Sequence, residues 1–224
     1  MEHGTRAILL DAMGTLLTFE PPAPRLRAVL RERGVEVPAE AAEAAIRDEI
    51  AYYRAHLHEG RDPDSLADLR RRAAEAMRPA LGVDGDLTEP LLAALRFRAY
   101  PDAAPALTAL RERGLAIVVV SNWDHSLHER LEETGLAGLL DGAVASAEFG
   151  VPKPDPAIFR HALELVGVQP GAAWHVGDSP REDVEGAEAA GLAGLLIARD
   201  GAPGAIASLA ELPERCAYPS RFSR

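Results

Sequence analysis

Five short apolar runs punctuate the chain, and segments with helical periodicity lie between most of them. The runs cover residues 6–10, 115–120, 143–146, 173–177 and 192–197. Continuous apolar runs of this length are typical of strands that are covered on both faces. The intervening segments have Pro or Asp near their starts and Gly at their ends, as helices do. This alternation predicts a doubly wound α/β fold with a parallel, Rossmann-like sheet.

Residues 18–98 break this alternation. They hold several amphipathic segments rich in Ala, Arg and Glu, and no convincing strand. The proline-containing stretches TFEPPAP and RAYPD on either side are candidate hinges. We therefore expect residues 1–17 and 99–224 to form a Rossmann-like catalytic core, and residues 18–98 to form an inserted all-helical cap. The amphipathic segments of this cap span 24–34, 38–58, 64–81 and 87–96.

Polar side chains stand where the predicted strands end. In an open parallel sheet the ligand crevice lies at the carboxyl ends of the strands, so these side chains are expected to meet at one mouth. The set combines carboxylates, an ammonium, a hydroxyl and an amide: Asp11, Ser121, Asn122, Lys153, Asp178 and Asp183.

Composition limits what the chain binds. The chain has 224 residues, 47% of them hydrophobic, and a formal net charge of -11. This charge repels a phosphate backbone, which disfavours nucleic acid as a partner and favours a small-molecule substrate. No apolar run approaches the roughly 18 residues that cross a bilayer, and the N-terminus lacks the layout of an export signal. The lone Cys216 forms no internal disulfide, so we expect a cytoplasmic protein without a membrane anchor and leave its oligomeric state open.

Arginine takes the place of lysine almost everywhere. Among 24 basic residues there is one lysine, Lys153, and the whole chain has one asparagine, Asn122. Such a lysine indicates a need for a compact, mobile ammonium rather than a planar guanidinium. Taken alone, chance survival at the surface explains it equally well, but the motif around Lys153 favours a role in chemistry.

Four motifs, in order, resemble those of the haloacid dehalogenase-like (HAD) hydrolase superfamily. They are DxxGT after the first strand, SN after the second, the lysine of KPDP, and GDSxxxD after the fourth strand. Each motif has limited specificity, but together and in this order they are specific, and they extend over essentially the whole chain. The sequence is most similar to the subgroup whose cap is inserted directly after the first motif.

The resemblance implies a role for each motif residue. Asp11 would be the nucleophile and form a covalent aspartyl ester, which water then hydrolyses. Lys153 would pair with Asp11 and neutralise the charge that develops on the substrate. Ser121 and Asn122 would bind the substrate, Asn122 either by its side chain or by shaping the loop, although both residue types also cap helices.

A Mg²⁺ ion is also implied. Its expected ligands are the carboxylates of Asp11, Asp178 and Asp183 and the backbone carbonyl of Met13. Three acids that face an anionic substrate repel it and one another, and a divalent cation relieves that repulsion. For Asp183 the alternative is an acid in the first turn of a helix, with no ligand role.

Met13 departs from the phosphatase pattern of the superfamily. At this position, two residues after the nucleophile, phosphatases have an aspartate that acts as general acid and then general base. Loss of one proton-transfer group costs about 10² to 10⁴ in rate, but matters less for a leaving group that departs without a proton. One interpretation is a Mg²⁺-dependent phosphohydrolase that acts on acyl or aryl phosphates, or that uses Glu20, His56 or His58 of the cap as its acid.

Two alternatives stay open. The 2-haloacid dehalogenase branch has a similar DAxGT stretch and expels halide without an acid, but it works without a metal and its last motif differs from GDSPRED. The intact Asp178 and Asp183 therefore favour phosphoryl chemistry. The other alternative is a catalytically weak chain that binds a phosphorylated ligand or a protein, supported mainly by Met13. His175, inside the predicted fourth strand, is interpreted as a core histidine.

Overall fold

The computed structural model describes residues 4–215 and divides the chain into two compact units. One unit comprises Met1–Thr18 together with Ala99–Arg224, and the other comprises Phe19–Arg98. Cys216, on which the expectation about disulfides rests, lies outside the described residues.

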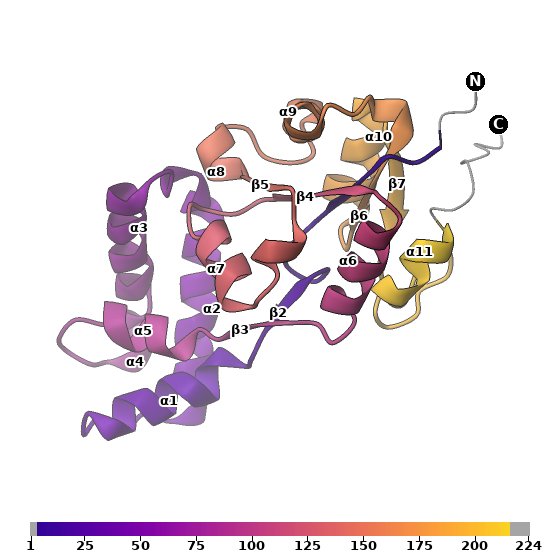
Figure 1. The fold of residues 1–224 in the computed structure, drawn as a ribbon. Coiled ribbons are helices and arrows are strands. Elements are labelled where there is room, and N and C mark those ends of the chain that lie inside the picture. The colour runs from indigo at the N-terminus through magenta and orange to yellow at the C-terminus, as the bar shows by residue number, and fades with distance from the viewer. Residues whose placement is uncertain (1–3, 216–224) are drawn as a thin grey trace. The chain divides into compact units, whose positions relative to one another are not determined.

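A five-stranded parallel sheet in the order β5-β4-β1-β6-β7 forms the centre of the larger unit (Figure 1). Each strand coincides with a predicted apolar run to within about a residue, and the doubly wound α/β fold is confirmed. The strands are β1 (Ala7–Leu10), β4 (Ala116–Ser121), β5 (Gly142–Ala145), β6 (Ala173–Gly177) and β7 (Ala193–Leu196).

Helices cover both faces of this sheet (Figure 1). Buried side chains of α9 and α10 share one hydrophobic core with Leu9 and Val120 of the sheet. Helix α6 packs against β4, and α11 packs against α6. Burying a large aliphatic side chain such as Leu9 contributes about 1.5 to 3 kcal/mol, so this packing fixes the sheet. The helices of this unit are α6 (Ala103–Glu112), α7 (Leu127–Glu133), α8 (Ser146–Phe149), α9 (Pro156–Val166), α10 (Gly186–Ala190) and α11 (Leu212–Arg215).

The strand order reverses at β1, which lies between β4 and β6. The register pairs Leu10 with both Val119 and Val176, so the carboxyl ends of these three strands lie close to one level. Ligand crevices of doubly wound sheets form at such a reversal. Asp11 follows β1 directly and therefore occupies the centre of this edge.

The smaller unit is helical and has its own core, which includes Leu26, Ile46 and Leu91. The predicted segment 64–81 forms two helices that meet at Met77, because Pro79 has no N–H to continue the first one. The helices are α1 (Pro22–Glu32), α2 (Ala39–His56), α3 (Pro63–Ala76), α4 (Arg78–Leu81) and α5 (Thr88–Ala94).

Two short strands, β2 (Leu17–Phe19) and β3 (Phe97–Ala99), pair where the chain passes from one unit to the other. The expectation of no strand within 18–98 is thus wrong at both ends of that range. Each strand has three residues, too few to show the alternation by which strands are recognised in a sequence.

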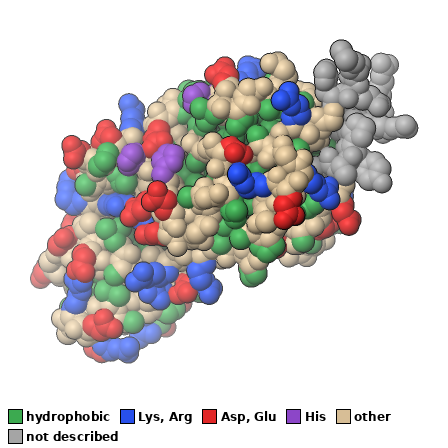
Figure 2. Space-filling model, in the orientation of Figure 1, with side chains coloured by type: hydrophobic (Ala, Val, Ile, Leu, Met, Phe, Trp, Pro, Cys, Tyr) green, Lys and Arg blue, Asp and Glu red, His purple; other side chains and the backbone are tan. Residues whose placement is uncertain are grey.

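Among the described residues, no helix combines the length and the apolar character needed to cross a bilayer. On the face drawn in Figure 2, acidic and basic side chains are interspersed, so the excess negative charge does not gather there in one patch.

Candidate active site

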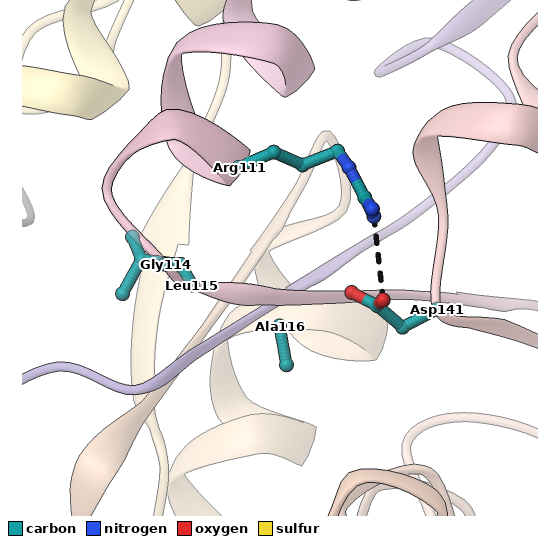
Figure 3. A pocket seen from close by; sticks show the side chains of 5 residues that line it. All are labelled: Arg111, Gly114, Leu115, Ala116 and Asp141. Carbon is teal, nitrogen blue, oxygen red and sulfur yellow. Dashed lines mark hydrogen bonds and ion pairs between the residues drawn. The ribbon is translucent and has the colours of Figure 1, made fainter.

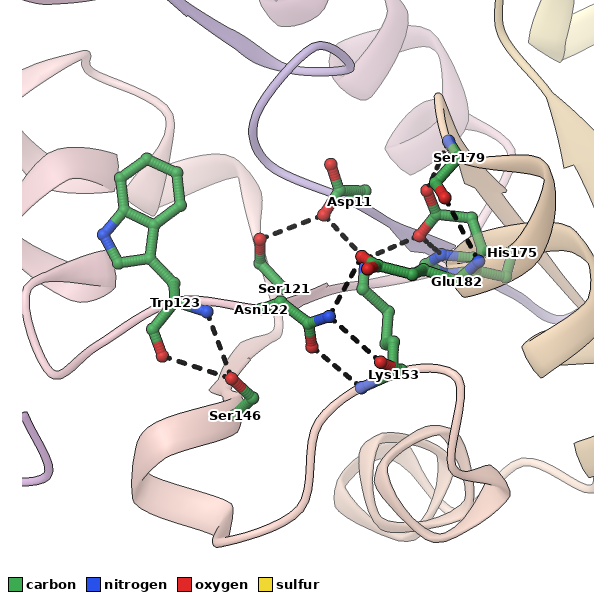
Figure 4. A network of polar contacts seen from close by, with 10 residues as sticks. Asp11, Ser121, Asn122, Trp123, Ser146, Lys153, His175, Ser179 and Glu182 are labelled. Atoms are coloured by element: carbon green, nitrogen blue, oxygen red, sulfur yellow. Dashed lines mark hydrogen bonds and ion pairs between the residues drawn. The ribbon is translucent and has the colours of Figure 1, made fainter. Parts of the chain in front are cut away.

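Lys153 and Asp11, 142 residues apart, meet at the carboxyl end of β1 (Figure 4). Lys153 Nζ donates a hydrogen bond to Asp11 Oδ1 at 2.6 Å, and Ser121 Oγ donates one to the same oxygen at 2.9 Å. All three residues are buried. Among residues 4–215, no group donates a hydrogen bond to Asp11 Oδ2. One carboxylate oxygen is thus held in place while the other is left without a donor, as a nucleophile would require.

The same ammonium also binds Asp183. Lys153 Nζ and His175 Nε2 both contact Asp183 Oδ1, at 2.6 and 2.9 Å, and the Ser179 N–H donates to Oδ2 at 2.9 Å. Asp183 lies in a segment of π-helix, Pro180–Glu185, that follows β6. These three contacts occupy most of its acceptor capacity, so Asp183 orients Lys153 whether or not it also binds a metal.

His175 is buried in the core, and it also contacts the candidate site through Asp183. The residue is fully buried, and its ring meets Phe159 edge-on at 4.9 Å. Alternation along β6 puts His175 on the same face as Gly177, and Asp183 packs directly over Gly177. No sequence pattern relates His175 to Asp183, eight residues further on, so reasoning from the sequence missed this contact.

Opposing effects set the ionisation of the buried groups. Burial raises the pKa of Asp11, and the Lys153 ammonium works against this shift. Burial acts in the same direction on Asp183, but the hydrogen bond from His175 and the charge of Lys153 hold the pKa of that carboxyl well below its usual range. For Lys153, burial favours the neutral amine, yet Asp11 and Asp183 together raise its pKa. Two carboxyl groups thus share the ammonium of Lys153 and favour its charged form.

Asn122 fixes the backbone of Lys153. Its Nδ2 donates to the Lys153 carbonyl at 3.0 Å, and its Oδ1 accepts from the Lys153 N–H at 2.8 Å. Its Nδ2 also donates to Glu182 Oε2 at 3.0 Å, a contact that the sequence did not reveal. The substrate contact expected for Asn122 stays a prediction, and the contacts in the structure are those of a residue that positions Lys153.

Three carboxyl groups form a potential cation site. Asp11, Asp178 and Asp183 each offer an oxygen, and these oxygens lie within 4.8 Å of one another. Burial and the charges of Asp11 and Asp183 raise the pKa of Asp178 to about 6. Hard oxygen donors that repel one another in this way suit Mg²⁺. Gly14, next to Met13 and with a φ of 81°, lies so close to Asp178 that a Cβ there would overlap the carboxylate.

The acids proposed from the cap all belong to the smaller unit. Glu20 pairs with Arg25 at 3.0 Å, and His56 Nδ1 contacts the Tyr52 carbonyl at 2.8 Å. A catalytic role for Glu20, His56 or His58 stays a prediction.

A shallow pocket of about 300 Å³ lies at the opposite, amino end of β4 (Figure 3). Arg111 and Asp141 face each other across it at 3.3 Å. None of the predicted site residues lines this pocket.

Replacement of Gly177 by Ala is expected to displace Asp183, because a Cβ at this position would overlap its carboxyl group. Overpacking of this kind costs about 1 to 3 kcal/mol in the free energy of unfolding. Urea denaturation measures that loss. Gly171→Ala is the matched control, since a Cβ there meets nothing within 4 Å. Equal stability of the two variants would contradict the tight packing of Asp183 on β6.

Comparison with known proteins agrees with this geometry. The family of haloacid dehalogenase-like hydrolases matches residues 5–191. The chain is 41% identical over 105 residues to the phosphoserine phosphatase of Thermus thermophilus, a match that covers 46% of this chain and 42% of that protein. It is 31% identical over 214 residues to (S)-2-haloacid dehalogenase 4A of Burkholderia cepacia, which covers 91% of this chain and 87% of that protein.

The fold is also similar to a crystal structure of a HAD phosphatase from Thermococcus onnurineus. The TM-score is 0.66 and the sequences are 26% identical, over 96% of this chain and 100% of that one. The chain spans only 38% to 49% of the lengths of the first curated relatives it matches. The sheet, the order of the four motifs and the match over residues 5–191 all lead to the same conclusion: the chain belongs to the haloacid dehalogenase-like hydrolases.

Proposed function

We propose that this hydrolase is a Mg²⁺-dependent phosphohydrolase that acts on a small phosphorylated metabolite. The observation that carries the proposal is the buried Lys153 ammonium, 2.6 Å from both Asp11 and Asp183 and beside a group of acids suited to a cation. Two positive centres at one nucleophile match the charge of a phosphoryl group. The similarity to a phosphoserine phosphatase and to a HAD phosphatase supports the same class of substrate.

Asp11 Oδ2 is the attacking atom in this proposal. It bonds to phosphorus as the bond from phosphorus to the leaving oxygen breaks, and the leaving group takes the electron pair. A water molecule then attacks the phosphorus of this aspartyl phosphate. The bond from phosphorus to Asp11 Oδ2 breaks and its electron pair restores the carboxylate, a proton of the water passes to solvent, and inorganic phosphate departs. Ser121 and Lys153 hold Asp11 Oδ1, so that the nucleophile keeps one orientation through both steps.

Asp11, Asp178 and the Met13 carbonyl would hold the Mg²⁺, with Asp183 as a further ligand. When bound, the ion supplies positive charge to a phosphoryl oxygen and offsets the repulsion among the acids.

Met13 restricts the substrates to those whose leaving group can depart without a proton. A thioether neither gives nor takes a proton, so an alkoxide would have to leave without protonation from this position. The carboxylate of an acyl phosphate and the phenolate of an aryl phosphate leave as stable anions. We infer that substrates of these two classes are preferred. The unit Phe19–Arg98 would serve as the cap that selects among them, and the chain would act in the cytoplasm on small molecules rather than on nucleic acid.

Phosphate release from acetyl phosphate and from p-nitrophenyl phosphate tests this proposal. We expect turnover with Mg²⁺ and a loss of at least about 10²-fold when EDTA removes it, because a Lewis acid supplies several kcal/mol of transition-state stabilisation. Turnover that is insensitive to EDTA would contradict the metal site.

A 2-haloacid dehalogenase is the second candidate, favoured by Met13 and by the similarity to (S)-2-haloacid dehalogenase 4A over 91% of the chain. Halide release from 2-chloropropionate, with no phosphate release in parallel assays, would establish this candidate and overturn the first. Absence of both activities, with retained binding of inorganic phosphate, would instead indicate a binding protein.

A further inference from the structure

Arg199 joins three segments of the larger unit that are far apart in sequence. It lies in the loop after β7, and its Nη2 donates to the Thr15 carbonyl at 2.6 Å. Nη1 and Nη2 donate to the two carboxylate oxygens of Asp102, at 3.0 and 3.1 Å. The guanidinium carbon also lies 3.5 Å from the centre of the Tyr100 ring. One side chain thereby links the turn after Asp11 to the segment by which the chain returns to the core.

Asp102 is itself held in place. Its carboxylate accepts further hydrogen bonds from Ser208 Oγ at 2.7 Å and from the Leu209 N–H at 2.9 Å. Arg199 Nε approaches the Gly14 carbonyl at 3.4 Å. The guanidinium is thus fixed by a bidentate ion pair on one side and points its remaining donors at two consecutive carbonyls of the turn. Lysine cannot reproduce this arrangement, because an ammonium lacks the planar fork.

The turn that Arg199 contacts also shapes the candidate active site. It begins two residues after Asp11 and contains Gly14, whose close approach to Asp178 leaves no room for a Cβ. The turn is closed by the Gly14 N–H, which donates to the Leu17 carbonyl at 2.8 Å. A shift of residues 13–15 toward Asp178 would therefore bring Gly14 into collision with that carboxylate.

We propose that Arg199, oriented by Asp102, is a positioning residue that holds the turn at residues 13–15 in register with Asp11 and Asp178. Its contribution to turnover rests on the proposed phosphohydrolase function, but its effect on the turn does not. Displacement of a reacting group by about 1 Å costs on the order of 10²-fold in rate, so a contact outside the reacting atoms is expected to affect turnover strongly.

Arg199→Lys tests the proposal, with Arg160→Lys as the matched control, because Arg160 reaches a single carbonyl, that of Ala189, at 3.5 Å. With acetyl phosphate and Mg²⁺ we expect Arg199→Lys to lower kcat by about 10- to 10²-fold and to leave KM within about threefold of wild type. Hydrogen exchange of the metal-free protein, followed on peptides that cover residues 12–18, should become at least about tenfold faster in Arg199→Lys and stay unchanged in Arg160→Lys.

Asp102→Asn provides a second route if Arg199→Lys folds poorly. It removes the charge that orients the guanidinium. Its effects on kcat and on hydrogen exchange should therefore be in the same direction as those of Arg199→Lys. In the double variant the two effects on kcat should be less than multiplicative, because both changes break the same ion pair.

Unchanged exchange at residues 12–18 in both single variants would overturn the proposal. Exchange that accelerates equally throughout the chain would overturn it as well, because Arg199 would then support the whole fold rather than this turn. If the wild-type protein releases no phosphate, the proposed function fails while the exchange experiment still decides the role of Arg199.

Discussion

Replacement of Asp11 by Asn is expected to abolish turnover of acyl phosphates and haloacids alike. The amide cannot form the covalent ester, and removal of a catalytic nucleophile lowers turnover by on the order of 10⁶-fold. Lys153 keeps Asp183 as its partner in this variant, so the fold is expected to persist. Phosphate and halide release measure the loss. Circular dichroism checks the fold.

A trapping experiment makes this prediction specific to the nucleophile. Acid quenching during turnover of radiolabelled acetyl phosphate should leave label on the wild-type chain and none on Asp11→Asn. Asp84→Asn is a matched control, since Asp84 is exposed and lies in the other unit. Wild-type turnover by Asp11→Asn would refute the proposed chemistry whichever substrate class proves correct.

Replacement of Met13 by Asp is expected to increase the hydrolysis of alkyl phosphates. Met13 is partly exposed and lies two residues after the nucleophile, where phosphatases of the family have their proton-transfer group. Restoring such a group should raise kcat/KM for β-glycerophosphate by about 10² to 10⁴. The rate with acetyl phosphate should change little, because its leaving group needs no proton.

Met13→Leu is the control for this gain, because it keeps an apolar side chain of similar volume. It should match the wild type on both substrates. If Met13→Asp does not raise kcat/KM for β-glycerophosphate, another residue already supplies the acid. The candidates are then Glu20, His56 and His58 in the smaller unit.

The sheet and the residues at its strand ends could be predicted from the sequence, because their positions follow from regular geometry. Continuous apolar runs mark buried parallel strands, and parallel strands end at a common edge, which brings Asp11, Ser121 and Asp178 to one place. Lys153 lies in a loop, and only its rarity and its motif singled it out. These signals were sufficient for the centre of the candidate site.

The contacts that support this centre could not be predicted in the same way. Asn122 was expected to assist by its side chain or by shaping the loop, and nothing in a dipeptide motif shows that its amide binds the backbone of Lys153. Arg199 and Asp102 are 97 residues apart and both lie outside the sheet, so no periodicity relates them. Loop-to-loop contacts of this kind depend on the final packing of the chain and leave no local pattern.

The single lysine has a practical consequence for experiments. Its side chain is 1% exposed, and it touches the carboxylate that we assign as the nucleophile. Isotopic labelling of lysine alone would place one NMR probe at the reacting centre, with no other lysine signal to obscure it. Amine-directed cross-linkers would find no ε-amino group on the surface of residues 4–215, so a reagent that does modify Lys153 reports on opening of the site itself.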